Sequence, residues 1–425
     1  MPVIASWFRA AAAALVFTAT WVTSARADVI SDWNAKAEVV VIEKRLRPPT
    51  AARTMAMMHV AMFEAVNAID RRYAPYRLKL SADKDIPKDT AAAAAAYAVL
   101  TTLYPDQQPG LDTALRALLA GVPDGDPKTK AIELGKRAAT EIMALRADDG
   151  INAKESYRPV TSPGVYIPTA VPVSSTDGAV TPWVMSTPSQ FRAPPPPALT
   201  SETWTRDLNE IREVAGAAST TRTPEQSEIG RFWFMTGPRA WNPIVRQLAE
   251  AKKLDTIDSA RLFALVALAS TDSFIAVFEA KYHYNLWRPL TAIRNADITG
   301  NKATPRDASW LPFGQGSHPV GDTPMHPEYP CAHCISSSAA GNVLKLIVGT
   351  EIPEVSMTSP TAPNATRKWT SLQAYIDEVS SARIYAGFHY RFSTKAAEEM
   401  GRKIAELTVA TQLRGASVSA APPTR

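Results

Sequence analysis

Three short segments in the second half of the chain combine cationic side chains with histidine. In the first, Lys281 and Arg288 are seven residues apart, so a helix through both would project them from one face, about 10 Å apart along its axis. Pro289 would close that helix. A solvated basic face is the usual setting of such a pair, but the apolar run at 274–278 indicates burial. Buried, fixed cations could bind a multiply charged anion.

The second segment runs from His326 to Cys334 and is followed by a series of small residues. This pattern predicts that a helix begins just after Pro330. The unpaired N–H groups at a helix start favour an anion. In the first turn of that helix, His333 could act as an acid or a base.

Two other chemistries are open to the second segment. One is a zinc site with His326, Cys331, His333 and Cys334 as ligands, although their spacing matches no common zinc motif. The other is a redox pair, because Cys331 and Cys334 are separated by two residues. They are the two cysteines of a 425-residue chain, which excludes a disulfide-rich scaffold.

The third segment contains Arg383 and His389, which are six residues apart. On a regular helix these side chains would point about 240° apart. They can converge only if the helix ends between them, and Gly387 is a plausible end. Taken together, the three segments predict that Lys281, Arg288, His333, Arg383 and His389 converge on one oxyanion pocket.

The order and spacing of these segments resemble the vanadium-dependent haloperoxidases and the type 2 phosphatidic acid phosphatase superfamily. The shared pattern is lysine, six residues and Arg-Pro; then Pro-x-x-His; then arginine, five residues and histidine. Longer stretches, among them ARTMAMMHVAMFEAVNAI, KYHYNLWRPLTAIR, HPEYPCAHC and ARIYAGFHYRFST, resemble the bacterial secreted haloperoxidase-like branch. The resemblance implies an all-α fold of helical bundles with the anion site in the C-terminal bundle.

The resemblance also implies a role for each site residue. The side chains of Lys281, Arg288 and Arg383 would neutralise the oxygens of vanadate or phosphate, and the backbone N–H of Ala332 would contact the anion. His333 would be the acid/base. His389 would be the axial vanadium ligand or, in a phosphatase, the nucleophile that forms a phosphohistidine.

Two positions depart from the family pattern. Cys331 replaces a serine that donates to the oxyanion, and a thiol is a weaker donor that peroxide can oxidise. If this thiol is free, we expect a lowered pKa and a Cys331→Ser variant that binds vanadate at least as tightly; a disulfide with Cys334 would remove the thiol. At the second position, Ser393 replaces an aspartate that orients the last histidine, and we expect its hydroxyl to accept the ring N–H.

Helical periodicity dominates the elements that must position these residues. Apolar side chains recur at steps of three and four through residues 55–69, 89–104 and 132–145, and a capping box at 223–226 begins another helix. Two further helices are expected at about 259–287 and 366–387. Strand-like alternation is scarce, so the sequence predicts an all-α protein.

The chain divides into five predicted parts. Residues 1–27 have the charged, apolar and Ala-x-Ala parts of a cleaved signal peptide. An N-terminal helical half follows at 28–158, then a proline-rich connection at 159–199, a C-terminal helical half at 200–415 and a disordered tail at 416–425. A surface-wrapping loop within one domain is an equal alternative for the proline-rich stretch. With 20% charged residues and a net charge of +5, the composition suits a globular protein and lacks a nucleic-acid footprint.

The leading hypothesis is an exported, periplasmic or secreted haloperoxidase that holds vanadate as its cofactor and oxidises halide with hydrogen peroxide. The alternative is a periplasmic acid phosphatase without a cofactor, in which His389 attacks phosphorus and His333 is the general acid. A non-catalytic oxyanion-binding protein or a Cys331/Cys334 redox protein represents another class. The expected partners are small molecules, with no nucleic acid and no integral membrane association after signal cleavage.

The remaining histidines have simpler interpretations. His59 is expected to be a core histidine, and His283 is expected to point away from the site. His318 and His326 could line an entrance to it.

Overall fold

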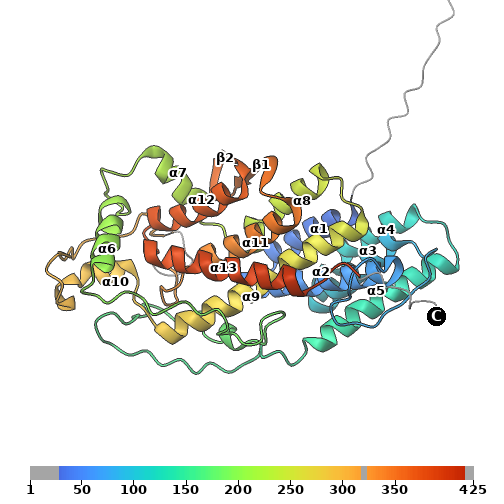
Figure 1. Ribbon diagram of the computed structural model, residues 1–425, viewed down its shortest axis with the longest axis horizontal. Helices are drawn as coiled ribbons and strands as arrows, with labels where there is room; N and C mark the ends of the chain where they lie inside the picture. The colour runs from blue at the N-terminus through green and yellow to red at the C-terminus, as the bar shows by residue number, and fades with distance from the viewer. Residues whose placement is uncertain (1–27, 317–322, 417–425) are drawn as a thin grey trace, which may run out of the picture.

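Helices make up most of the computed structural model, which describes residues 28–316 and 323–416. The predicted signal segment, His318 and all but the first residue of the predicted tail lie outside the described residues. At one end of the elongated molecule lie the five N-terminal helices (Figure 1). They are α1 (Val29–Glu43), α2 (Pro48–Asp70), α3 (Lys88–Leu103), α4 (Gln108–Ala120) and α5 (Asp126–Leu145).

The predicted helices of the N-terminal half are confirmed. The Met-rich face of α2 is buried, and its helix begins with Pro48 and Pro49, as expected of prolines in a first turn. The alanines of α3 are buried against α5, because small side chains let the two backbones approach closely. Short 3-10 turns lie at Pro105–Gln107, Asp177–Ala179, Gly237–Ala240 and Ala296–Thr299.

The long helix α9 (Thr256–Tyr284) joins the two halves of the molecule. It packs against α2 on one side and α11 on the other, and 29 residues make it roughly 43 Å long. Among the described residues it is the helix long and apolar enough to cross a membrane, but 94% of its most apolar window is buried inside the protein. This helix is therefore the core of the fold.

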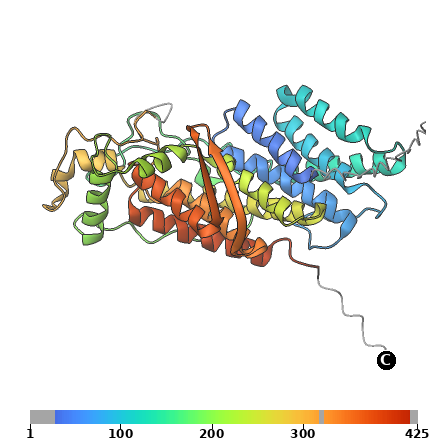
Figure 2. The same ribbon diagram turned by 90° about the horizontal axis from the view of Figure 1, so that it is seen from above.

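The second half surrounds the C-terminal part of α9 (Figures 1 and 2). Its main helices pack in one bundle in which α11 contacts α9, α12 and α13. They are α6 (Glu202–Val214), α7 (Pro224–Phe232), α8 (Asn242–Ala251), α10 (Pro289–Arg294), α11 (Ala332–Val348), α12 (Leu372–Tyr385) and α13 (Arg391–Thr411). The predicted capping box at the start of α7 is present. The all-α prediction is confirmed.

One pair of strands is an exception to the all-helical prediction. The antiparallel hairpin β1 (Glu351–Ser359) and β2 (Ala362–Ser371) pairs Val355 with Trp369. The expectation of helix from residue 366 is therefore wrong, because Ser371 caps a helix that begins only at Leu372. Irregular register in the hairpin interrupts the alternation of buried and exposed side chains. The sequence therefore lacks the two-residue period by which strands are predicted.

The proline-rich segment at 159–199 runs along α9 (Figure 1). Asp272 of α9 accepts the backbone N–H groups of Trp183, Val184 and Met185 at 2.7–2.9 Å. The Trp183 side chain is buried. The segment is therefore fastened to the core helix, and the division of the chain into the predicted parts stays a prediction.

Candidate functional site

Lys281 and Arg288 come together at the C-terminal end of α9, but the predicted shared helix face is wrong. The helix ends at Tyr284, and Asn285 has left-handed backbone angles (φ 52°), which turn the chain. Arg288 then lies in extended backbone as the residue before α10. The two cations converge because the chain turns between them, not because a helix continues to Pro289.

The Lys281 ammonium is completely buried under the loop that precedes α11. Its Nζ donates to the carbonyls of Pro327 (2.9 Å) and Glu328 (2.7 Å). Burial, followed by repulsion from Arg288 and Arg383, holds the pKa of Lys281 well below its usual value. A negative charge nearby would stabilise this ammonium.

Arg288 is also fully buried and bridges two loops. Its Nε donates to the His326 carbonyl (2.9 Å), and its Nη1 donates to the Phe388 carbonyl (3.0 Å). A second contact from Nη1 reaches Nε2 of His389 at 3.3 Å, and Nη2 lies 2.9 Å from Nδ1 of His326. Burial lowers the pKa of Arg288 to about 10. These contacts fix the guanidinium against the loops that carry both histidines.

Arg383 projects from the last turn of α12. Its Nη1 donates to the Trp233 carbonyl (2.8 Å), and its guanidinium carbon lies 4.9 Å from the Phe388 ring centroid. The Nε and Nη2 atoms are buried, and no described residue accepts a hydrogen bond from them. Burial and, next, the charge of Arg288 lower the pKa of Arg383 to about 9. Two N–H donors of a buried cation are therefore left for an acceptor that the protein does not supply.

The His389 side chain can approach Arg383 because α12 ends before Gly387, as predicted. Gly387 has φ +82°, and a Cβ on it would lie 2.7 Å from the Pro312 side chain, so the turn requires glycine. The His389 ring is buried, with Nδ1 2.9 Å from Oε1 of Glu328. Because a guanidinium can only donate, Nε2 must offer a lone pair to Arg288, and Nδ1 must carry the proton. The ring is thus a neutral histidine whose Nε2 is available as a ligand or nucleophile.

Glu328, not Ser393, orients His389, which corrects the expectation from the sequence. The same Oε1 atom accepts the backbone N–H of Tyr390 at 3.0 Å. Burial raises the pKa of this carboxyl to about 7, against the opposing effects of Lys281 and Arg288. A sequence signal exists, since a glutamate stands inside an otherwise apolar His-Pro-Glu-Tyr-Pro run, but no spacing rule ties it to residue 389.

Helix α11 begins where the sequence predicted, but its cap is a disulfide. Cys331 is the residue before the helix, its Sγ accepts the backbone N–H of Cys334 at 3.2 Å, and the two sulfurs are bonded to each other. A disulfide sulfur carries no proton, so the prediction that Cys331 donates a hydrogen bond to the oxyanion is wrong. The zinc alternative also fails, because both thiols are consumed and no cluster of metal-binding side chains occurs among the described residues.

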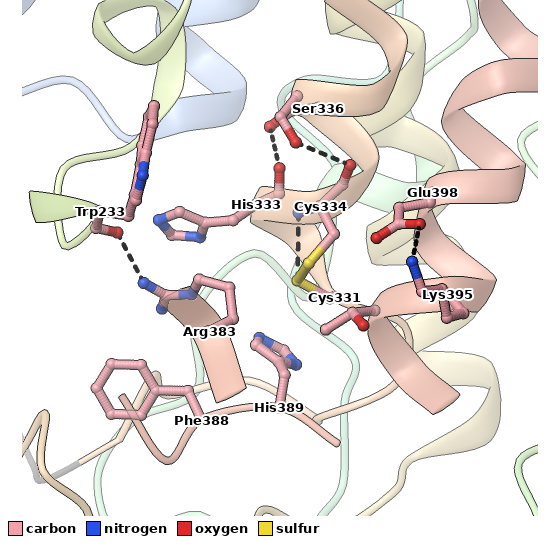
Figure 3. The surroundings of a disulfide bond; sticks show 12 residues. Trp233, Cys331, His333, Cys334, Ser336, Arg383, Phe388, His389, Lys395 and Glu398 are labelled. Atoms are coloured by element: carbon pink, nitrogen blue, oxygen red, sulfur yellow. Dashed lines mark hydrogen bonds and ion pairs between the residues drawn. A yellow bond between two sulfur atoms is a disulfide. The ribbon is translucent and has the colours of Figure 1, made fainter. Parts of the chain in front are cut away.

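A cavity of about 460 Å³ connects these groups. Its polar end is formed by His326, Ala332, His333, Arg383 and His389. Figure 3 shows the side chains of His333, Arg383 and His389 gathered around the disulfide. The structure therefore brings the five predicted residues together, since Arg288 contacts His389 and the charges of Lys281 and Arg288 act on both His389 and Arg383.

The other histidines lie as expected where they are described. His59 is buried, stacks on Phe263 and contacts Nδ2 of Asn34 at 2.9 Å. His283 is exposed and contacts Arg192. His326 lines the cavity and holds Arg288.

The charge balance of the site fits a tetrahedral oxyanion. Lys281, Arg288 and Arg383 are buried together, and Glu328 is the carboxylate that faces them among the described residues. The pKa of Glu328 is raised, and even its full negative charge would balance only one of the three cations. Uncompensated buried charge is costly, and an anion of two or three charges would remove that cost. The open donors of Arg383 and the Nε2 lone pair of His389 suit the oxygens and the central atom of vanadate.

Comparisons with known proteins agree with this geometry. Residues 261–415 match the VCPO second helical-bundle domain. A curated relative, vanadium chloroperoxidase of Curvularia inaequalis, is 26% identical over 468 aligned positions, which cover 83% of this chain and 76% of that protein. The second helical half thus matches a domain of the vanadium chloroperoxidases, and most of the chain is similar to an enzyme of that family.

Solved structures of the superfamily share the fold. The first bacterial vanadium-dependent iodoperoxidase superposes with a TM-score of 0.77 at 24% identity, covering 90% of this chain and 96% of the other. A holo-type bacterial vanadium-dependent chloroperoxidase gives a TM-score of 0.65 at 16% identity, covering 85% and 91%. The helical scaffold that carries the site is therefore that of bacterial vanadium haloperoxidases.

Proposed function

We propose that the protein is an exported vanadate-dependent haloperoxidase that oxidises halide with hydrogen peroxide. The observation that carries the proposal is the group of three buried cations beside His389, which lines the cavity and has an unprotonated Nε2. Likeness to a vanadium chloroperoxidase and to bacterial haloperoxidase structures supports it.

The protein's own residues would hold vanadate as follows. Lys281, Arg288 and Arg383 cancel the charge of the oxygens, and the open Nε and Nη2 atoms of Arg383 donate to them. Nε2 of His389 would be the ligand to vanadium. The backbone N–H of Ala332, at the start of α11, adds a donor at the positive end of the helix dipole.

Glu328 and His333 then control the protons. Glu328 keeps the proton of His389 on Nδ1, so Nε2 stays unprotonated. His333 lines the cavity, where its ring would accept a proton from hydrogen peroxide and later donate one. Vanadate, when bound, supplies the Lewis acid that makes peroxide reactive towards halide.

The disulfide favours the peroxide reaction over phosphate ester hydrolysis. A free thiol at Cys331 would be oxidised by the enzyme's own substrate. Because Cys331 and Cys334 are bonded to each other, the site presents no thiol to peroxide. The same disulfide also supports export, since such bonds persist in oxidising compartments, and the N-terminal 27 residues have the sequence of a cleaved signal.

Paired assays test the proposal. Oxidation of iodide, bromide and chloride is measured with orthovanadate and hydrogen peroxide, beside hydrolysis of p-nitrophenyl phosphate without vanadate. We expect halide oxidation that depends on vanadate. Phosphate ester hydrolysis alone would replace the proposal by the phosphatase alternative, and activity in neither assay would favour an oxyanion-binding or redox protein.

A His333→Ala variant separates turnover from binding. Loss of a general acid/base lowers rates by about 10²–10⁴-fold, whereas vanadate binding should persist because the three buried cations and His389, which would hold vanadate, are unchanged. The matched control is His283→Ala, whose exposed ring lies outside the cavity. Equal rates of halide oxidation in both variants would exclude His333 as the acid/base.

A further inference from the structure

A second, much smaller cavity lies in the interior, apart from the candidate site. It measures about 10 Å³ and is lined by α2, by α9 and by the segment that runs from the 3-10 turn Gly237–Ala240 into α8. All of its lining residues are buried, and none of them lines the cavity of the candidate site. Its volume is about that of one water-sized sphere.

Three side chains around this small cavity carry a polar atom that lacks a protein partner. They are Nδ1 of His59, Nδ2 of Asn242 and Oγ of Ser270, and no described residue forms a hydrogen bond with any of them. The three residues are 1%, 4% and 1% exposed, respectively. Buried polar atoms without a partner are rare because each one costs free energy. Three of them around one cavity therefore indicate a hydrogen-bonding molecule inside it.

The hydrogen bonds of His59 determine what that molecule must offer. Nη1 of Arg246 donates to Oδ1 of Asn34 at 2.6 Å, so Nδ2 of Asn34 donates to Nε2 of His59 at 2.9 Å. The ring is neutral, because burial lowers its pKa to about 3, and its single proton is therefore on Nδ1. His59 and Asn242 thus each supply an N–H donor, and the Ser270 hydroxyl can accept or donate.

One water molecule matches this set of partners. Its oxygen accepts two hydrogen bonds, which the N–H groups of His59 and Asn242 provide, and one of its protons is donated to Oγ of Ser270. Buried waters typically make about three hydrogen bonds to polar groups that would otherwise be unsatisfied. Size and hydrogen bonding therefore agree on the same occupant.

A halide ion would also accept hydrogen bonds from these groups, but the charge around the cavity does not favour it. The His59 ring is neutral, and the Arg246 guanidinium is paired with Glu38 at 2.9 Å. A buried anion without a compensating cation is costly. A neutral water avoids that cost.

We propose that this small cavity binds one water molecule as an integral part of the fold, hydrogen-bonded to His59, Asn242 and Ser270. The water continues the chain of hydrogen bonds that starts at the Glu38–Arg246 ion pair. It thereby joins α1, α2, α8 and α9 through polar contacts inside an otherwise apolar core. The proposal is independent of the reaction that the protein catalyses.

A high-resolution crystal structure of the full mature protein, from crystals grown in sodium bromide, tests the proposal directly. We expect one ordered water whose oxygen lies about 2.7–3.2 Å from Nδ1 of His59, Nδ2 of Asn242 and Oγ of Ser270, without anomalous signal at the bromine edge. An anomalous peak in the cavity would assign it to halide, and the absence of any ordered density would show that it stays dry. Either result would overturn the proposal.

Nuclear magnetic resonance of protein with isotope-labelled histidine tests the same water in solution. The Nδ1 proton of His59 should give a cross-peak to a bound water. Ser270→Val removes one partner of the water and adds a methyl group to its space, so this variant should lose the cross-peak. The matched control is Ser273→Val, since Ser273 is equally buried on α9 but lies outside the cavity, with its hydroxyl bonded to the Ser270 carbonyl.

The control should keep the cross-peak at the wild-type intensity. Equal intensity in Ser270→Val and Ser273→Val would contradict the site, and so would a wild-type spectrum without the cross-peak. If Ser270→Val fails to fold, the wild-type spectrum and the crystal structure still decide.

Discussion

The pair of Glu328 and His389 decides what the site can bind. Nδ1 of His389 lies 2.9 Å from the carboxylate, and Nε2 faces Arg288. The lowered pKa of His389, caused first by burial and then by the three neighbouring cations, keeps the ring neutral. Glu328 accepts the proton of Nδ1, and Nε2 of the neutral ring therefore keeps its lone pair.

A Glu328→Gln variant should bind orthovanadate about 10–100-fold more weakly, the usual effect of removing a group that supports a metal-binding histidine. The amide can turn its NH₂ group towards Nδ1, which would then have to give up its proton to Nε2. Calorimetry measures the affinity, and exposed Glu250→Gln serves as control. Wild-type affinity in Glu328→Gln would show that the carboxylate does not orient the ring.

The state of the cysteines gives a second prediction. The protein should show no reactive thiol when unfolded without reductant, and two after reduction, because Cys331 and Cys334 are its two cysteines and are bonded. Titration with a thiol reagent in guanidinium chloride measures this. Two thiols without reductant would contradict the disulfide and restore the free-thiol hypothesis for Cys331.

The sequence was sufficient to predict the cations and the histidine of the site, but not the carboxylate that orients the histidine. Lys281, Arg383 and His389 could be named because their spacing matches a family pattern, and Gly387 had to end α12 for Arg383 and His389 to meet. Glu328 was missed because a contact between residues 61 positions apart leaves no local period.

At the scale of elements, α9 carries Lys281 and also fastens the proline-rich segment. Asp272, nine residues before Lys281 on the same helix, accepts three backbone N–H groups of that segment. Val173 of the same segment donates its N–H to the Met325 carbonyl and lines the cavity. The helix therefore lines part of the cavity through Phe274 and Phe278 and also carries one of the cations.

Asp272→Asn should lower the free energy of unfolding by about 3 kcal/mol. Charge-assisted hydrogen bonds of a buried carboxylate contribute about 1.5–3 kcal/mol each, and the single oxygen of the amide can replace only part of them. Urea denaturation measures this. The control Asp297→Asn, at an exposed aspartate, should stay within about 0.5 kcal/mol of wild type. A similar result for Asp272→Asn would mean that the segment is held elsewhere.

Element ends were harder to predict than element existence. Each helix expected from periodicity is present, but α9 stops at Tyr284 because Asn285 takes a left-handed conformation, not at Pro289. The start of α12 was misplaced because strand β2 ends in Ser371, which then caps the helix. Turn and cap geometry depends on tertiary contacts that a periodic pattern does not contain.

At the scale of the whole molecule, the core between α1, α2 and α9 contains His59. Arg246 donates to Oδ1 of Asn34 at 2.6 Å, so the amide nitrogen of Asn34 must donate to Nε2 of His59. Burial, and then the charge of Arg246, lowers the pKa of His59 to about 3. The folded protein therefore keeps this ring neutral under conditions that protonate it in the unfolded chain.

Stability should consequently fall as the pH decreases from about 6.5 to about 3. In this window the unfolded state takes up a proton at His59 that the folded state refuses, which removes up to about 1.4 kcal/mol per pH unit. Urea unfolding across this range measures the slope. His59→Gln should flatten it and exposed His283→Gln should not; an unchanged slope in His59→Gln would contradict the assignment.

The central claim is that one buried cluster of cations binds vanadate, and a calorimetric titration of the protein with orthovanadate tests it most directly. Two arginines provide a matched comparison, since Arg383 and Arg231 each lie 4.9 Å from a phenylalanine ring, and only the first lines the cavity. We predict one equivalent bound by wild type and by Arg231→Ala, and at least about tenfold weaker binding by Arg383→Ala, the effect of losing a charged hydrogen bond. No binding by wild type, or equal affinity in both variants, would contradict the account.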